Sequence, residues 1–155
     1  MGTLNLRVYG IFINDQKQLL VSDELIRGGR FTKFPGGGLE FGEGTRDCLA
    51  REFMEEMNLK VAVLDHFYTT DFFQESAFRP GDQILSIYYR VQPLEPIKVR
   101  LSQKPFDFDE EQLQRYTSLR ETESFRFIDW DMVSEDCVTL PIDKIVVRKL
   151  KELFG

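Results

Sequence analysis

The chain has 155 residues, of which 42% are hydrophobic and 30% charged, a composition that excludes a chain disordered throughout. Its 26 acidic residues outnumber its 20 basic ones and give a net charge of −6, which argues against a broad basic surface for extended nucleic acid. This length is typical of one domain, and we expect a single domain over residues 1–155.

Cysteine usage and the N-terminal sequence indicate a compartment. Cys48 and Cys137 lie far apart, which is typical of reduced thiols, and we expect both to be unreactive core residues. The first ten residues lack the character of a signal peptide, and no apolar run approaches membrane-spanning length. The sequence therefore predicts a cytoplasmic protein with no membrane partner.

The first third of the chain has extended and irregular segments before a helix. Residues 4–13 and 18–25 are rich in β-forming side chains and predict two strands joined by a turn. Residues 26–33 carry glycines and basic side chains and predict a loop, and the glycine-rich residues 34–44 predict a second loop. Helical periodicity over residues 45–58 predicts a helix directly after these glycines.

The middle of the chain returns to extended structure. Residues 59–73 predict a strand with a break, residues 74–82 a loop and residues 83–92 a strand, with residues 97–101 as a further strand. Residues 102–124 are polar and acidic, and a segment of this length without clear periodicity is typical of a lid, a functional loop or disorder.

The chain ends in a strand and a helix. Residues 125–130 predict the last strand, and residues 141–155 predict an amphipathic helix that begins at Pro141, a residue suited to the first turn. Strands, a helix in mid-chain, further strands and a terminal helix together predict an α/β chain of the α+β type, with a mixed β-sheet flanked by helices.

The predicted helix over residues 45–58 places three carboxylates beside its apolar side. At about 100° per residue, Glu52, Glu55 and Glu56 fall within an arc of roughly 100°. Such a charged face is usually solvated, and that interpretation stays open. Arg51 among the acids and a glycine loop leading into the helix favour a site instead. Clustered carboxylates bind hard cations such as Mg²⁺ or Mn²⁺, which also bind substrate phosphates.

The spacing of residues 37–59 follows a longer pattern. Its matching positions are Gly37, Glu43, Arg51, Glu52, Phe53, Glu55, Glu56 and Leu59. This segment resembles the signature of the Nudix hydrolase superfamily, G-x5-E-x7-R-E-U-x-E-E-x-G-U, in which U is a bulky apolar residue. Residues 34–40 and 127–130 also resemble family segments. Asn58 stands where the family has Gly at the helix end, and since Asn tolerates a left-handed conformation, we expect the fold and the metal site to be kept.

The resemblance implies a fold and a reaction. It implies a Nudix-like α/β/α sandwich and a pyrophosphohydrolase, a hydrolase acting on acid anhydrides. Such an enzyme uses Mg²⁺ or Mn²⁺ to cleave a nucleoside diphosphate linked to another group X. Glu52 and Glu56 would be metal ligands, and Glu55 a ligand or the group that orients water.

The resemblance also implies supporting roles for other residues of the segment. Arg51 would pair with Glu43 and hold the geometry between loop and helix. Gly37 and Gly38 would let the backbone approach the metal and the phosphates. Family members often take one further acidic ligand or base from outside the segment, and Glu123 lies nearest the usual location, with Glu110, Glu111 and Glu121 as neighbours. A solvated loop charge is the alternative for each of these four glutamates.

Basic and aromatic residues near the predicted loops are weaker candidates. Arg30 and Lys33, with Arg27, precede the glycine run and suit contacts to substrate phosphates, although ordinary surface charge explains them equally well. Four phenylalanines lie near loops and suit stacking on a base, namely Phe31, Phe72, Phe73 and Phe78, although a Phe in the core is the usual alternative. Arg79, in the loop of residues 74–82, suits contact with a ligand.

The leading function is therefore hydrolysis of a small nucleotide, which is a nucleoside or deoxynucleoside triphosphate, ADP-ribose or a nucleotide sugar. A non-nucleoside diphosphate is a second substrate class, and a sensor that binds a nucleotide without turnover is the alternative from outside the enzymes. We expect a small-molecule partner and no extended nucleic acid. Many relatives dimerise, so the resemblance leaves a homodimer open, and the sequence does not name X.

Overall fold

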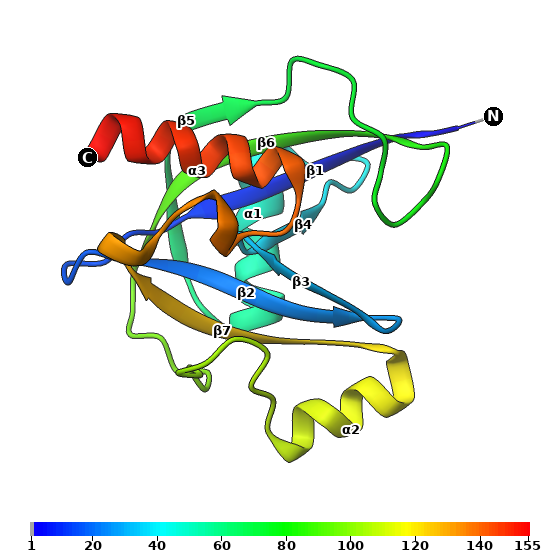
Figure 1. Ribbon diagram of the computed structural model, residues 1–155. Coiled ribbons are helices and arrows are strands. Elements are labelled where there is room, and N and C mark those ends of the chain that lie inside the picture. Colours follow the sequence, from blue (N-terminus) through cyan, green and yellow to red (C-terminus); the bar gives the residue numbers. More distant parts are fainter. Residues whose placement is uncertain (1) are drawn as a thin grey trace. The chain divides into compact units, whose positions relative to one another are not determined.

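The computed structural model describes residues 2–155, whose strands form two β-sheets (Figure 1). The strands are β1 (Leu4–Ile11), β2 (Gln18–Ile26), β3 (Gly29–Lys33), β4 (Gly36–Gly38), β5 (Val61–Thr69), β6 (Gln83–Pro93) and β7 (Glu121–Asp129). The helices are α1 (Thr45–Met57), α2 (Glu110–Leu119) and α3 (Pro141–Phe154), with short 3-10 turns η1 (Trp130–Met132) and η2 (Glu135–Cys137). This content confirms the expected α+β class. None of the helices in residues 2–155 combines the length and the apolar character needed to cross a bilayer.

One compact unit comprises residues up to Phe12 together with residues 35–98. Its sheet has the order β4-β1-β6-β5, with β1 parallel to β6 and the outer pairs antiparallel, so the predicted mixed sheet is confirmed. Helix α1 contacts this sheet, and a Cβ on Gly10 of β1 would collide with the ring of Phe53. The buried residues of α1 are Cys48, Leu49, Phe53 and Met57. Burial of this stripe leaves the acidic side of the helix free of the core.

The other compact unit comprises residues 13–34 and 99–155. Its sheet has the order β3-β2-β7 and is antiparallel throughout. Strands β2 and β3 form a hairpin whose turn residues Arg27 and Gly28 have φ of 48° and 85°. Positive φ at both turn positions matches the twist of the flanking strands, which explains the Gly at the second one.

Helix α3 begins at Pro141 as predicted, since a proline in the first turn removes only an N–H that has no helical partner. Its buried residues include the apolar stripe Ile142, Val146, Val147 and Leu150. The prediction of an amphipathic terminal helix is therefore confirmed.

Three predicted segments differ from the structure. Residues 34–44 were expected to be a loop throughout, but Gly36–Gly38 form the short strand β4. Residues 26–33 were expected to be a loop, but Gly29–Lys33 form β3, because the tight turn at Arg27 and Gly28 returns the chain against β2. Residues 97–101 were expected to be a strand, but only Leu101 makes a single bridge, to Phe125. Cys137, expected in the core, is only partly buried, whereas Cys48 is fully buried.

The long polar segment of residues 102–124 is ordered and contains both a helix and the start of a strand. Asp109 begins α2 with a reciprocal capping box, in which Asp109 accepts from the Gln112 backbone and the Gln112 side chain accepts from the Asp109 backbone. Strand β7 begins at Glu121, four residues earlier than predicted. Helix α2 has no buried residue, which explains why apolar periodicity did not reveal it.

Candidate functional site

The glycine run forms the short strand β4 along β1. Gly36 pairs with Tyr9, Gly37 with Val8 and Gly38 with Arg7. Gly36 has φ of 152°, and a Cβ there would collide with the carbonyl oxygen of Val8, so no other residue fits at this position. The run is thus an edge strand, and close packing against β1 requires the glycine at position 36.

Gly37 is also required by the helix that follows. A Cβ on Gly37 would lie inside van der Waals contact of the carboxyl carbon and both carboxyl oxygens of Glu52. The carboxylate of Glu52 therefore rests directly against the β4 backbone, and its side chain is only 15% exposed. This contact joins the glycine strand to the acidic side of α1.

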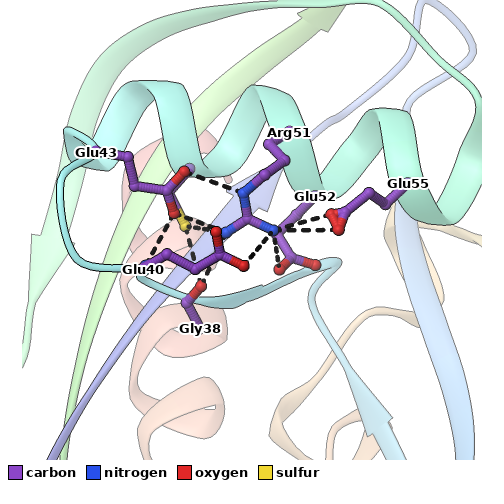
Figure 2. A network of polar contacts seen from close by, with 7 residues as sticks. Gly38, Glu40, Glu43, Arg51, Glu52 and Glu55 are labelled. Atoms are coloured by element: carbon purple, nitrogen blue, oxygen red, sulfur yellow. Dashed lines mark hydrogen bonds and ion pairs between the residues drawn. The ribbon is translucent and has the colours of Figure 1, made fainter.

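Arg51 lies at the centre of a network of carboxylates (Figure 2). Its Nε donates to Oε2 of Glu43 at 3.0 Å and its Nη2 to Oε1 of Glu43 at 2.7 Å, a two-point ion pair. Nη2 also donates to the carbonyl of Gly38 at 3.1 Å. Nη1 donates to Oε1 of Glu52 at 3.0 Å and to Oε2 of Glu55 at 2.9 Å. One guanidinium therefore fixes the strand, the loop and two acids of the helix, as the resemblance implied for Glu43.

The network shifts the pKa values of its members. The hydrogen bonds from Arg51, and then the one from the Glu40 backbone N–H, lower the pKa of Glu43 from its usual 4.5 to about 2. The same pairing, with Glu43 first, raises the pKa of the Arg51 guanidinium. Burial, followed by the charge of Glu43, raises the pKa of the Cys48 thiol to about 12. Glu43 and Arg51 are therefore charged, and Cys48 is a neutral thiol, across the physiological range.

The three acids of α1 are held in different ways. Glu52 is nearly covered, whereas Glu55 is 54% exposed, and Arg51 bonds to both. Glu56, one turn beyond Glu52, is half-buried. Within residues 2–155, no three acidic, His or Cys side chains are already gathered as a metal centre. The donors nevertheless fit a hard cation, because they are carboxylate oxygens on one helix side, with Glu52 seated against a glycine backbone that adds no side chain.

Asn58 ends α1 in a left-handed conformation, with φ of 48° and ψ of 45°. Its backbone N–H donates to the carbonyl of Met54 at 3.0 Å, and the N–H of Leu59 donates to Phe53 at 3.4 Å. This is the geometry that a Gly would give, and the expectation that Asn supports it is confirmed.

Lys33, Arg30 and Glu123 lie in the unit of residues 13–34 and 99–155. Lys33 and Arg30 are three positions apart on β3, so their side chains point to opposite faces of the sheet. Lys33 is buried and forms an ion pair of 3.2 Å with Glu24. Glu123 of β7 pairs in register with Glu24, on the same face as Lys33. Arg30 is on the other face and exposed, with its guanidinium 5.5 Å from the Phe106 ring centre.

Glu123 is a partly desolvated carboxylate. Its side chain is 17% exposed, and its ion pair with Arg115 of α2 has a long distance of 3.7 Å. Burial raises its pKa above the usual value, with the charge of Arg115 opposing that shift. A partly desolvated carboxylate suits a role as base or ligand. The sequence suggested a loop position for Glu123, and a loop would not have held its carboxylate in this way.

A pocket of about 370 Å³ lies next to the end of β4, inside the unit that holds α1. Two of its residues, Phe78 and Arg79, were candidates from the sequence, and the pocket places them with Gly38. Asn5 and Arg7 of β1 also line the pocket and were not predicted as site residues. The available signal was the alternation of these two polar residues with leucines along β1, and only the pairing of β1 with the glycines gives it meaning.

Comparison with known proteins agrees with this fold. The model of the NUDIX domain family matches residues 3–135 of the chain. The E. coli ORF135 protein has a similar solution structure, with a TM-score of 0.69 at 15% identity, covering 99% of this chain and 93% of that one. The MutT protein from Methanosarcina mazei Go1 has a similar crystal structure, with a TM-score of 0.69 at 14% identity, covering 99% of this chain and 97% of that one. The MutT protein from methicillin-resistant Staphylococcus aureus 252 has a solution structure with a TM-score of 0.60 at 19% identity, and the match covers 99% of each chain.

Proposed function

Since this chain belongs to the NUDIX domain family and is a Nudix pyrophosphohydrolase, we propose that it uses Mg²⁺ or Mn²⁺ to cleave a nucleoside diphosphate linked to another group X. The observation that carries this proposal is the Arg51 network, in which one guanidinium bonds to Glu43, Glu52 and Glu55 and to the carbonyl of Gly38 on the glycine strand. We take residues 1–155 as one Nudix domain, acting in the cytoplasm on a small molecule.

The residues of α1 supply the cation site in this proposal. Glu52 and Glu56 hold the cation, and Glu55 is either a third ligand or the group that orients the attacking water. When bound, the cation supplies positive charge that offsets the phosphate oxygens and polarises the P–O bond. Arg51 is a positioning residue, because it fixes Glu52 by a hydrogen bond while its own charge is paired with that of Glu43.

The backbone and the adjacent pocket bind the rest of the substrate. Gly37 and Gly38 have no side chains to keep phosphates away from the strand. The pocket beside Gly38 takes the group at one end of the substrate, with Phe78 suited to contact a ring and Arg7 and Arg79 suited to contact anionic oxygens. Arg79→Gln should raise KM several-fold with little change in kcat, because this contact is made equally in the ground and transition states.

Glu123 is proposed as the further acidic residue, as ligand or base, and Lys33 and Arg30 as phosphate contacts. The roles of Arg30 and of the other two residues can be tested separately, since Lys33 and Glu123 share one face of their sheet and Arg30 lies on the other. Glu123→Gln should lower kcat. Full activity of this variant would remove Glu123 from the proposal and leave the α1 residues in it.

The test is a phosphate-release panel with Mg²⁺ and with Mn²⁺, covering nucleoside and deoxynucleoside triphosphates, ADP-ribose, nucleotide sugars and dinucleoside polyphosphates. Turnover should need the cation and should fall on the order of 100-fold or more in Glu56→Gln. Glu152→Gln, which removes an exposed carboxylate from α3, is the matched control and should keep its activity.

Two outcomes would change the proposal. Turnover that is unaffected by Glu56→Gln would place the chemistry elsewhere. No turnover of any compound, with a nucleotide that still raises Tm, would favour a sensor that binds a nucleotide without hydrolysis.

A further inference from the structure

A second cavity lies in the unit of residues 13–34 and 99–155. Its volume is about 560 Å³, which is within the range of small-molecule sites. Strands β3 and β7, the loop at Phe106 and the segment that follows β7 form its walls. None of the residues that line it belongs to the Arg51 network or to the pocket beside Gly38. The function proposed above gives a role to Arg30 alone among the lining residues, as a phosphate contact, and leaves the rest of the cavity without one.

The sheet register separates this cavity from the residues linked to catalysis. Thr32 pairs with Asp23, and Arg126 pairs with Val21, two residues before Asp23 on β2, so both side chains share one face with Arg30. Lys33 and Glu123 lie on the opposite face of the same sheet. The cavity thus has a separate set of side chains.

Two residues that line the cavity, Thr32 and Arg126, belong to a fixed charge network. The carboxylate of Asp23 is fully buried, and it accepts hydrogen bonds from Nε of Arg126 at 2.6 Å and Nη2 at 3.1 Å. The hydroxyl of Thr32 donates to the same carboxylate at 2.7 Å. Among residues 2–155, no group accepts a hydrogen bond from Nη1 of Arg126. Arg126 is therefore held in place with donor capacity left over at a cavity wall.

An aromatic wall stands beside a second arginine. The guanidinium of Arg30 lies 5.5 Å from the centre of the Phe106 ring and, within the described part of the chain, has no carboxylate partner. Phe106 has φ of 56°, a conformation that bulky residues rarely adopt. Backbone strain of this kind is most often kept where a side chain must point in one direction. At Phe106 the strained backbone carries a ring that lines the cavity.

We infer that this cavity binds a small aromatic monoanion, an aromatic carboxylate, with its ring against Phe106 and its oxygens on the guanidinium groups of Arg126 and Arg30. The planar guanidinium suits a carboxylate, and a flat ring suits a wall made of an aromatic and an arginine. Asp129 and Asp136 also line the cavity, and their charge disfavours a ligand with two or more negative charges.

The test uses three probes that share a ring and differ in charge, namely 1-naphthoate, 1-naphthamide and 1-naphthyl phosphate. Each is titrated into the full-length wild-type chain while arginine Nε–H signals are followed by NMR. Naphthoate should shift the signals of Arg30 and Arg126 and bind more tightly than either other probe. Equal binding of the amide would overturn the need for an anion, and tighter binding of the phosphate would overturn the choice of a monoanion.

Variants separate a binding site from a structural role. Arg30→Gln should weaken the binding of naphthoate about tenfold, because a charge-assisted contact is lost while the buried pair of Arg126 and Asp23 stays intact. Arg27→Gln, an exposed arginine of the same hairpin outside the cavity, is the matched control and should bind as the wild type does. Phe106→Gly should weaken binding while Tm stays the same or rises, since Gly relieves the positive φ. Unchanged naphthoate affinity in both Arg30→Gln and Phe106→Gly would overturn the site.

Discussion

Arg51 holds Glu43 by two parallel hydrogen bonds, from Nε to Oε2 at 3.0 Å and from Nη2 to Oε1 at 2.7 Å. The same Nη2 also reaches the carbonyl of Gly38 on the glycine strand. Only a planar guanidinium can make these contacts together, since an ammonium is a point charge without the fork geometry. The relationship between Arg51 and Glu43 is therefore a constraint on the whole site.

Replacing the guanidinium while keeping its charge tests this constraint. Arg51→Lys should lower kcat/KM on the order of 10- to 100-fold and lower Tm, because the two-point pair and the contact with Gly38 cannot both be kept. The measurement is steady-state kinetics with thermal unfolding. Arg46→Lys is the control, since Arg46 lies on the same helix and bonds to Val63 outside the network. Equal losses in both variants would show that α1 is sensitive to any such change.

The lowered pKa of Glu43 predicts a pH dependence of stability. Its folded-state pKa, about 2, is below its usual 4.5, so folding favours the ionised form. The stabilisation is fully present above about pH 4.5 and is lost as the pH falls toward 2. Chemical unfolding of the wild type and Glu43→Gln should show the wild type more stable at neutral pH, with the difference narrowing through this window. A difference that is constant from pH 6 to pH 2 would contradict the assigned pKa.

The contact of Gly37 with Glu52 predicts the effect of one added methyl group. Gly37→Ala should lower kcat/KM on the order of 100-fold, because the Glu52 carboxylate must move away from the strand. Gly38→Ala adds the same methyl group to the next residue, where the nearest atom is Nη1 of Arg7 at 3.4 Å, and should have a smaller effect. Steady-state kinetics of the two variants, with Tm measured for both, checks this difference. Equal activities of the two variants would refute the role of the contact between Gly37 and Glu52.

The left-handed conformation of Asn58 predicts opposite responses to two substitutions. Asn58→Gly should be at least as stable as the wild type, since Gly adopts this conformation without steric cost. Asn58→Ala should lower the free energy of unfolding by about 1 kcal/mol, because a Cβ without a polar side chain is disfavoured there. Denaturant unfolding measures both. An alanine variant as stable as the glycine variant would mean that the helix end rearranges.

The acidic helix shows what sequence alone determines. Helical spacing is local, so the positions of Arg51, Glu52 and Glu55 along residues 45–58 already place them on one side of a helix. The left-handed end at Asn58 follows from backbone sterics, which are local as well. For this reason the family, the helix and the pairing of Arg51 with Glu43 were all predictable.

Strand pairing was decided by the tertiary structure, because it joins residues far apart in the chain. Arg7 became a candidate only when β1 paired with the glycines and the loop of residues 74–82 closed a pocket beside them. Arg30 and Lys33 were equivalent in the sequence, and they separated once β3 paired with β2, since neighbouring positions of a strand alternate between its faces. The sequence therefore determined the chemistry of the helix, and long-range pairing decided which other side chains share a face or a cavity.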